Sequence, residues 1–232
     1  MCRCSTEWQR FDVSDLTSSN RFQLLLYGDL NSQSADLLIY GAQTEQGSYP
    51  TSYIPTNGAA VTRLAETANG AGDATTFNDS EGVLMAEISA LADDNTDRVI
   101  SINNGGTSDY IRLRYHTVSN TVRFVIKSGG SVDFDYSITL PSTLGFNKIA
   151  IKYDNTNVYL WVNGIDYFTF SPITPLIGLS TLDFDTGSTS PFYGKTKQIQ
   201  YFQTALTDSE LEELTSWDSF AAMAQGQLYS IK

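Results

Sequence analysis

Hydrophobic and polar residues alternate along much of the chain between residues 82 and 201, in short runs separated by turn residues. The clearest runs are 110–116, 121–127 and 133–140, where apolar side chains recur at every second position. A period of two is typical of strands with one buried and one solvated face. Turn residues at intervals of about 8 to 12 positions are typical of a sandwich or barrel. The pattern therefore predicts an all-β, antiparallel fold for this region.

The turns between these three runs predict how the strands pair. Pairing His116 with Thr121, and Lys127 with Ser131, keeps all the apolar side chains on one face of a three-strand meander. A slip of one residue would move them to the other face. We therefore expect one core face and one solvated face.

The solvated face of the meander carries three arginines. The expected register places Arg123 opposite Asp135, with Arg112 and Arg114 nearby. One interpretation is that these arginines are internal partners for Asp135 and its neighbours, each exposed ion pair being worth about 0.2–1 kcal/mol. The other is that all three arginines bind acidic sugars, with Arg112 and Arg114 as the candidate glycan-binding residues. The net charge of the chain favours the first interpretation.

Two further hairpins follow. The runs 148–153 and 158–162 flank a polar turn, and Asn163-Gly164 predicts a tight turn into 165–170. Tyr159 and Trp161 then point away from the core face. Aromatic rings stack on the apolar faces of sugars, so this pair is a candidate glycan-binding site. The alternative is that a crossing loop, a C-terminal helix or a neighbouring subunit covers both rings.

The ends of the chain differ from its middle. Thr207 and Glu210 form a capping box that predicts a short C-terminal helix. Strand-like runs at 8–13, 21–27 and 35–42 are too few to make a sandwich alone. The predicted organisation is a partial β jelly-roll segment with its exit linker (1–57), a linker (58–80), a β-sandwich (81–217) and a C-terminal tail (218–232), with a further helix (219–225) and strand (228–231) in the tail.

Charge and composition exclude several classes of partner. Acidic residues outnumber basic ones 26 to 14, giving a net charge of -12. Such a chain repels nucleic acid and anionic lipid. No apolar run approaches the roughly 20 residues of a spanning helix, so we expect no membrane insertion. No signal peptide is visible at the N-terminus. Cys2 and Cys4 are expected to be free thiols, and the single histidine, His116, excludes a three-histidine metal site.

Paired carboxylates on one strand could cleave glycosidic bonds. Asp133 and Asp135, and Asp183 and Asp185, have the spacing to share a strand face, but neither pair has a third acid at the expected offset. We therefore expect no enzyme activity. The acidic run 93–97 is not an EF-hand, because Arg98 stands where the loop needs glycine.

Four segments, in order and spacing, resemble laminin G-like, concanavalin A-like jelly rolls. They are FNKIAIKYD (146–154), VYLWVNG (158–164), the strand 193–202 and ALTDSEL (205–211). Upstream, IYGAQ (39–43) and EQGSYPTSYIPT (45–56) resemble the closing strands and exit linker of carbohydrate-binding-module-like jelly rolls. Such segments precede laminin G-like domains in phage tail and virion proteins and in bacterial surface proteins. The missing front half of this first module implies a truncated ancestor or completion by another chain.

This resemblance implies an antiparallel β-sandwich of the jelly-roll type with a short C-terminal helix. It implies a noncatalytic carbohydrate-binding or adhesion module in a virion or on an extracellular surface. Its partners would be a glycan or cell-surface polysaccharide, and homo-oligomer or other virion subunits. Because many laminin G-like modules carry Ca²⁺, Asp183 and Asp185 are weak candidate ligands. A purely structural oligomerisation or decoration module remains open, and a glycan-cleaving enzyme is a third alternative.

Overall fold

A computed structural model describes residues 7–12, 38–45, 49–62, 68–187 and 189–218. It divides the chain into two compact units, 1–65 and 66–232, which are described separately. The predicted helix and strand at 219–225 and 228–231 lie outside the described residues, as do Cys2 and Cys4. In the described residues no helix has the length and apolar character needed to cross a membrane.

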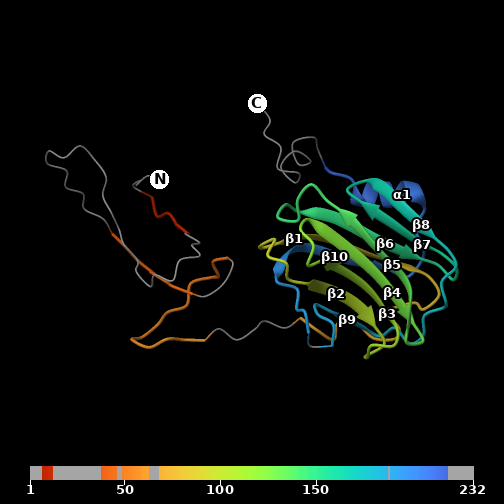
Figure 1. Cartoon of the computed structure of the whole chain (residues 1–232), viewed down its shortest axis with the longest axis horizontal. Helices are drawn as coiled ribbons and strands as arrows, with labels where there is room; N and C mark the ends of the chain where they lie inside the picture. Colours follow the sequence, from red (N-terminus) through yellow and green to blue (C-terminus); the bar gives the residue numbers. More distant parts are fainter. Residues whose placement is uncertain (1–6, 13–37, 46–48, 63–67, 188, 219–232) are drawn as a thin grey trace. The chain divides into compact units, whose positions relative to one another are not determined.

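The second unit consists of two antiparallel five-stranded sheets packed face to face (Figure 1). We call them the front sheet, of order β5-β4-β3-β2-β9, and the back sheet, of order β10-β1-β6-β7-β8. The predicted fold class, an antiparallel β-sandwich with a short C-terminal helix, is confirmed. The elements are β1 (Gly82–Ala90), β2 (Arg98–Asn103), β3 (Tyr110–Tyr115), β4 (Thr121–Ser128), β5 (Ser131–Thr139), β6 (Asn147–Tyr153), β7 (Val158–Val162), β8 (Ile165–Phe170), β9 (Thr181–Asp183), β10 (Gly194–Phe202) and α1 (Asp208–Thr215).

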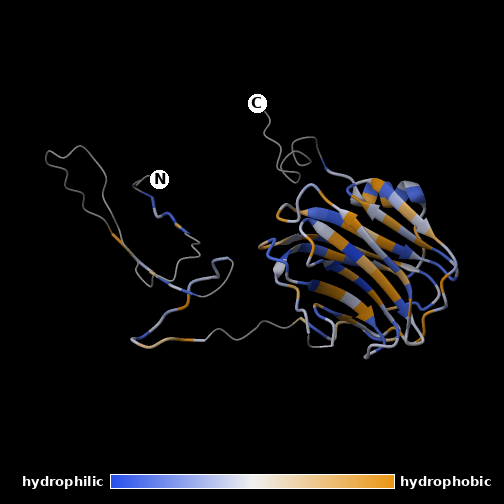
Figure 2. Ribbon diagram, in the orientation of Figure 1, coloured by the Kyte–Doolittle hydropathy of each residue, from blue (hydrophilic) through white to orange (hydrophobic). Residues whose placement is uncertain are grey.

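Apolar side chains from both sheets meet between them. Leu84 and Ile151 of the back sheet, and Ile100, Leu113 and Phe124 of the front sheet, are fully buried in one continuous core. Burying each such side chain stabilises the fold by roughly 1.5–3 kcal/mol. The period of two read from the sequence is visible as alternating colours along the front-sheet strands (Figure 2). The core is therefore built by the residues that the alternation predicted.

The register of the meander differs in one place from the prediction. The backbone N–H of His116 donates to the carbonyl of Thr121, as expected. Across the second turn, however, Ser131 pairs with Ser128 rather than with Lys127. The two-residue turn at Gly129-Gly130 is tighter than the three-residue turn we expected, and an irregularity after Ile126 shifts the register once more. Each change shifts the pairing of β4 and β5 by one residue. Together they shift it by two, so the apolar side chains stay on the predicted face.

The helix α1 covers part of the back sheet. Its predicted capping box is present: Thr207 accepts from the N–H of Glu210, and the Glu210 carboxylate accepts from the Thr207 N–H. These bonds hold the pKa of Glu210 below its ordinary value. On its buried side, Leu211 is fully enclosed. At the C-terminal end of the helix, the Nζ of Lys148 donates to the carbonyl of Ser216 at 2.8 Å. The helix is thus fastened to β6 of the back sheet.

Part of the stretch predicted as a linker packs against the sandwich. Ala71 forms a β-bridge with Leu182, and Phe77 enters the core. The hydroxyl of Tyr153 lies within hydrogen-bond distance of the carbonyl of Asn78. Residues 68–80 therefore belong to the second unit.

The first unit contains no strand or helix in its described residues, 7–12, 38–45 and 49–62. The N–H of Thr51 donates to Glu45, and the N–H of Ile54 donates to Gln43. The described parts of the predicted strands 8–13 and 35–42 are therefore not strands, and 21–27 lies outside the described residues. Trp8 and Leu38 are 73% and 86% exposed, so these runs do not bury the apolar face that a sheet would need.

Candidate functional site

Part of the outer face of the back sheet is covered by α1. Trp161, 6% exposed, packs with Met85, Ala150 and Leu211 beneath α1, and Tyr159 packs against the same cluster. The Nζ of Lys152 lies 4.1 Å from the centre of the Tyr159 ring. The outward ring face expected for Trp161 is therefore not available. Coverage by the C-terminal helix, the alternative left open by the sequence, is what the structure shows.

The front sheet has a different outer face. On this face, its two central strands, β3 and β4, carry four basic residues and no acidic one: Arg112 and Arg114 in β3, and Arg123 and Lys127 in β4. No run of the sequence is rich in lysine or arginine. The two strands bring these residues together from separate segments, so they concentrate positive charge in a chain with a net charge of -12.

Two of the four basic side chains on this face have a carboxylate partner. Arg114 binds Asp97 at 3.0 Å. The Nε of Arg123 donates to Asp135 at 2.6 Å, and His116 Nε2 lies 3.1 Å from the same guanidinium. The ion pair predicted between Arg123 and Asp135 is confirmed. It runs diagonally, because Asp135 stands opposite Val125 in the ladder.

Replacing Asp135 with asparagine is expected to lower the free energy of unfolding by about 0.5 kcal/mol at pH 7, since the pair is partly exposed. The hydrogen bond from Arg123 holds the pKa of Asp135 below its ordinary value. The stabilisation is therefore present above the unfolded-state pKa and is lost as the pH falls through the folded-state pKa. Urea unfolding at pH 7 and at about pH 2.5 tests this. A difference between variant and parent that stayed constant with pH would contradict it.

Arg112 has no such partner. Its guanidinium carbon lies 3.5 Å from the centre of the Tyr110 ring, and its Nε is buried without a hydrogen bond. Among the described residues, none forms an ion pair or a hydrogen bond with the Arg112 side chain. Burial lowers the pKa of Arg112 below its ordinary value, and the neighbouring charge of Arg114 lowers it further. Arg112 is thus a half-buried cation without a counter-charge.

Tyr110 joins Arg112 to a second basic residue. The Nζ of Lys127, on β4, lies 5.8 Å from the centre of the same ring. Within the described parts of the chain, Lys127 also has no carboxylate partner. Tyr110 itself is only 6% exposed. Arg112 and Arg114 were candidate site residues from their place in the sequence, whereas Tyr110 and Lys127 were not.

The candidate calcium ligands have other bonds. Asp183 accepts from the N–H of Gly70 at 2.6 Å and from the side-chain amide of Asn103 at 2.7 Å. Asp185 accepts from the side-chain amide of Asn69 at 2.5 Å. These contacts orient both carboxylates toward N–H donors. Across the described ranges, no three histidine, cysteine, aspartate or glutamate side chains gather where they could hold a metal ion.

The other carboxylate pair, Asp133 and Asp135, is also engaged. Asp133 accepts from the backbone N–H of Thr174 at 2.7 Å, which ties β5 to the segment after β8. Asp135 is bound to Arg123. Each of the two acids therefore has a structural partner within the protein.

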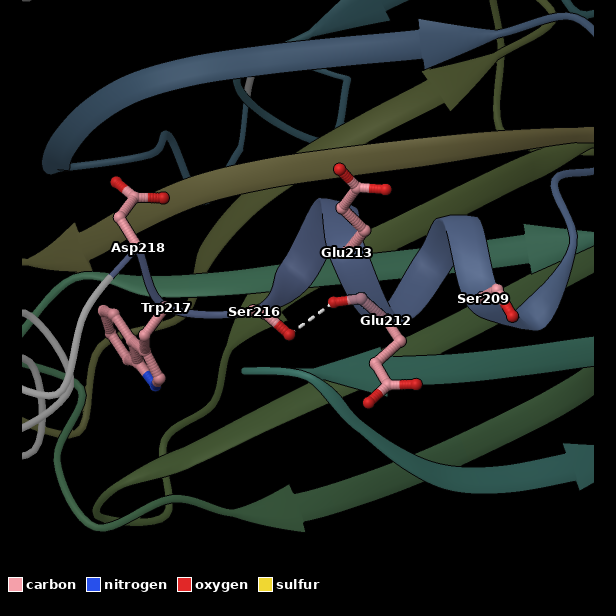
Figure 3. Close-up of a pocket in the computed structure, with 6 residues that line it drawn as sticks. All are labelled: Ser209, Glu212, Glu213, Ser216, Trp217 and Asp218. Atoms are coloured by element: carbon pink, nitrogen blue, oxygen red, sulfur yellow. Dashed lines mark hydrogen bonds between the residues drawn. The ribbon is translucent and has the colours of Figure 1, made fainter.

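An open groove of about 470 Å³ runs along the outer side of α1 (Figure 3). Figure 3 shows its acidic side chains projecting from the helix and from the segment that follows it. The lining residues are Ser209, Glu212, Glu213, Ser216, Trp217 and Asp218. Its negative lining distinguishes this groove from the positive outer face of the front sheet.

Solved structures share the sandwich fold. A carbohydrate-binding module of the Ruminococcus gnavus IT-sialidase, bound to α2,6-sialyllactose, is 17% identical, with 66% of this chain and 96% of that chain covered and a TM-score of 0.51. A pentraxin from Limulus polyphemus is 10% identical, with 66% and 76% covered and a TM-score of 0.51. Domain 4 of a Geobacillus stearothermophilus arabinanase, in complex with arabinotriose, is 14% identical, with 62% and 70% covered and a TM-score of 0.50.

At these identities the likeness establishes the fold alone. No family model matches the sequence, and no curated protein matches it. The chain thus has the β-sandwich architecture found in carbohydrate-binding modules and in a pentraxin.

Proposed function

We propose that the protein is a noncatalytic carbohydrate-binding module, and that it binds glycans on the outer face of the front sheet. The observation that carries this proposal is the group of four basic side chains on the outer face of β3 and β4, two strands that carry no acid, in an acidic protein. The sandwich fold shared with carbohydrate-binding modules supports it. A role in adhesion, on a phage tail, a virion or a cell surface, is the setting that the sequence resemblance implies.

The chemistry of this face suits a sugar. Sugar hydroxyls accept and donate hydrogen bonds, and Arg112 and Lys127 offer N–H donors that no carboxylate of the described chain occupies. The covered outer face of the back sheet offers no comparable surface, because α1 lies over Trp161. Binding at a shallow sheet face would use several polar contacts rather than a deep cavity.

Retention on immobilised polysaccharides tests the proposal. We expect the full chain to be retained by at least one member of a panel of neutral and acidic glycans. A double variant in which both Arg112 and Lys127 are replaced with glutamine is expected to bind about tenfold or more weakly, since each donor contributes about 1 kcal/mol or more to the binding free energy. The matched control is Lys195→Gln, at an exposed position on the back sheet.

The two variants should unfold close to the temperature of the parent, because none of the three replaced side chains has an ion-pair partner in the described structure. Equal retention of the double variant and the parent would place glycan binding elsewhere. Retention of the parent by none of the glycans would refute the function itself.

A second candidate is a structural oligomerisation module, and one observation favours it. In the described part of the first unit, large apolar side chains are exposed: Trp8, Phe11, Leu38, Ile39, Tyr40, Tyr53 and Val61. Apolar surface of this kind is normally covered by a partner. A sedimentation coefficient larger than that of one chain, together with no glycan retention, would favour this candidate.

A further inference from the structure

We propose that Arg112 anchors the carboxylate of an acidic sugar, and that Lys127 faces the same group from the neighbouring strand. The inference rests on the proposed glycan-binding function and narrows its ligands to carboxylate-bearing glycans. The structural basis is the convergence of two cations, both without a carboxylate partner in the described chain, on the single ring of Tyr110.

The neighbours of Arg112 on the outer face leave it without a counter-charge. In the ladder it stands between Ser101 on one side and Val125 on the other. The next residues along this row are Asp183 beyond Ser101 and Asp135 beyond Val125. Each lies two strands away from Arg112, about 9–10 Å at the usual spacing of strands. An acid adjacent to Arg112 would have neutralised it, and none is present in this row.

Both of those acids are already bound. Asp183 accepts from Gly70 and Asn103, and Asp135 is paired with Arg123. They therefore cannot turn toward Arg112 without giving up their own hydrogen bonds. The attraction for an external anion is correspondingly retained at Arg112.

The guanidinium is also held in place before a ligand arrives. It stacks on Tyr110, a nearly buried ring, and this contact restricts the rotation of a long side chain. A planar guanidinium presents paired N–H donors that match the two oxygens of a carboxylate. Because the donor is already ordered, less conformational entropy is lost on binding.

The charge of the whole protein argues for a carboxylate rather than a polyphosphate. A net charge of -12 repels an extended polyanion such as nucleic acid. A single carboxylate on a sugar feels mainly the local field of Arg112 and Lys127, since charges beyond about 8–10 Å are screened by salt. The remaining hydroxyls of the sugar would meet the polar edge of the same face.

Matched pairs of ligands test the inference by calorimetry. The probes are sialyllactose against its carboxyl methyl ester, and trigalacturonate against its methyl ester, so that each pair differs only at the carboxylate. We expect the acidic member of at least one pair to bind about tenfold or more tightly, in line with a charge-assisted hydrogen bond. Arg112→Gln should remove this preference, whereas Lys195→Gln should preserve it.

Arg112→Lys gives a sharper readout. Lysine keeps the charge but loses the planar pair of donors, so it should restore only part of the preference. The preference of the parent protein for the acidic ligand should also fall as the NaCl concentration is raised, because salt screens charges that are close to the protein surface. A thermal unfolding curve of each variant shows that it is folded before binding is compared.

The outcomes separate the inference from the proposed function. Equal binding of acidic and neutral members, with binding still present, would overturn the inference and leave the glycan-binding function standing. A preference for sulfated over carboxylated glycans in a parallel titration would overturn the carboxylate assignment. Absence of binding to every glycan of the panel would overturn both.

Discussion

Replacing Trp161 with alanine is expected to lower the free energy of unfolding by about 3–5 kcal/mol, the usual cost of removing a large buried aromatic side chain. Trp161 is the largest side chain between the back sheet and α1, where it packs with Val83, Met85 and Leu211. Its removal leaves a cavity that a short helix fastened at its end cannot fill. Denaturant unfolding followed by circular dichroism measures the change.

Phenylalanine at the same position is the informative control. The indole N–H of Trp161 is buried without a partner, so Trp161→Phe keeps most of the ring and loses no hydrogen bond. We expect it to cost much less than alanine. Tyr193→Ala, at an exposed ring, should be nearly neutral. An alanine variant at position 161 as stable as the parent would mean that α1 does not pack on this face.

Replacing Asp109 with alanine is expected to lower the free energy of unfolding by about 2–4 kcal/mol, because it leaves buried N–H groups without an acceptor. Oδ1 of Asp109 accepts from the N–H of Gly129 and from that of Ile177, both at 3.2 Å. Asp109 is only 5% exposed. Its carboxylate therefore joins the β4–β5 turn to the loop before β9. Differential scanning calorimetry of the variant against the parent measures the loss.

Asp109→Asn distinguishes the effect of losing the hydrogen-bond acceptor from the effect of losing the volume of the side chain. Asp109→Asn keeps one side-chain oxygen and should cost less than half as much as alanine. Because Asp109 directly precedes Tyr110, we also expect the alanine variant to disturb the ring that supports Arg112 and so to weaken glycan retention. Unchanged stability in the alanine variant would show that water replaces the carboxylate without loss.

The local elements could be predicted because their signals lie within a few residues. Alternation predicted the three strands of the meander, and Asn163-Gly164 predicted a turn in which both residues have positive φ. The capping box at Thr207 predicted the start of α1. The register of β4 and β5 was missed because a bulge leaves no mark in the pattern, which continues with the same faces on both sides.

The candidate site could be predicted only in part. Arg112 was placed on the solvated face by its position between Ile111 and Leu113. That it lacks a partner depends on Asp97 and Asp135, which reach Arg114 and Arg123 instead. These ion pairs join segments that are far apart in the sequence. The periodicity of strands (two residues) or helices (3.6 residues) therefore does not predict them. The absence of any acid from 98–103, 110–115 and 121–128 was a readable signal that we did not use.

The role first considered for Trp161 failed for a related reason. A strand pattern says which side of the sheet a residue faces, but not whether another element lies there. Leu211, which covers it, comes 50 residues later in the chain. The exposed apolar runs at the N-terminal end were wrongly predicted to be strands. Residues with a high β-propensity form strands when one face of the strand can pack against other side chains, and the described residues there have no such packing.

The helix on the back sheet covers the middle of one of the two broad surfaces of the sandwich. On the proposed function, each copy would bind a glycan across the other surface alone, and a single contact of this kind is expected to be weak. Weak contacts add up when several copies are displayed together, because each engaged copy raises the local concentration of ligand for the next. Avidity, rather than the affinity of a single site, would then set the lifetime of the complex between such an assembly and its ligand.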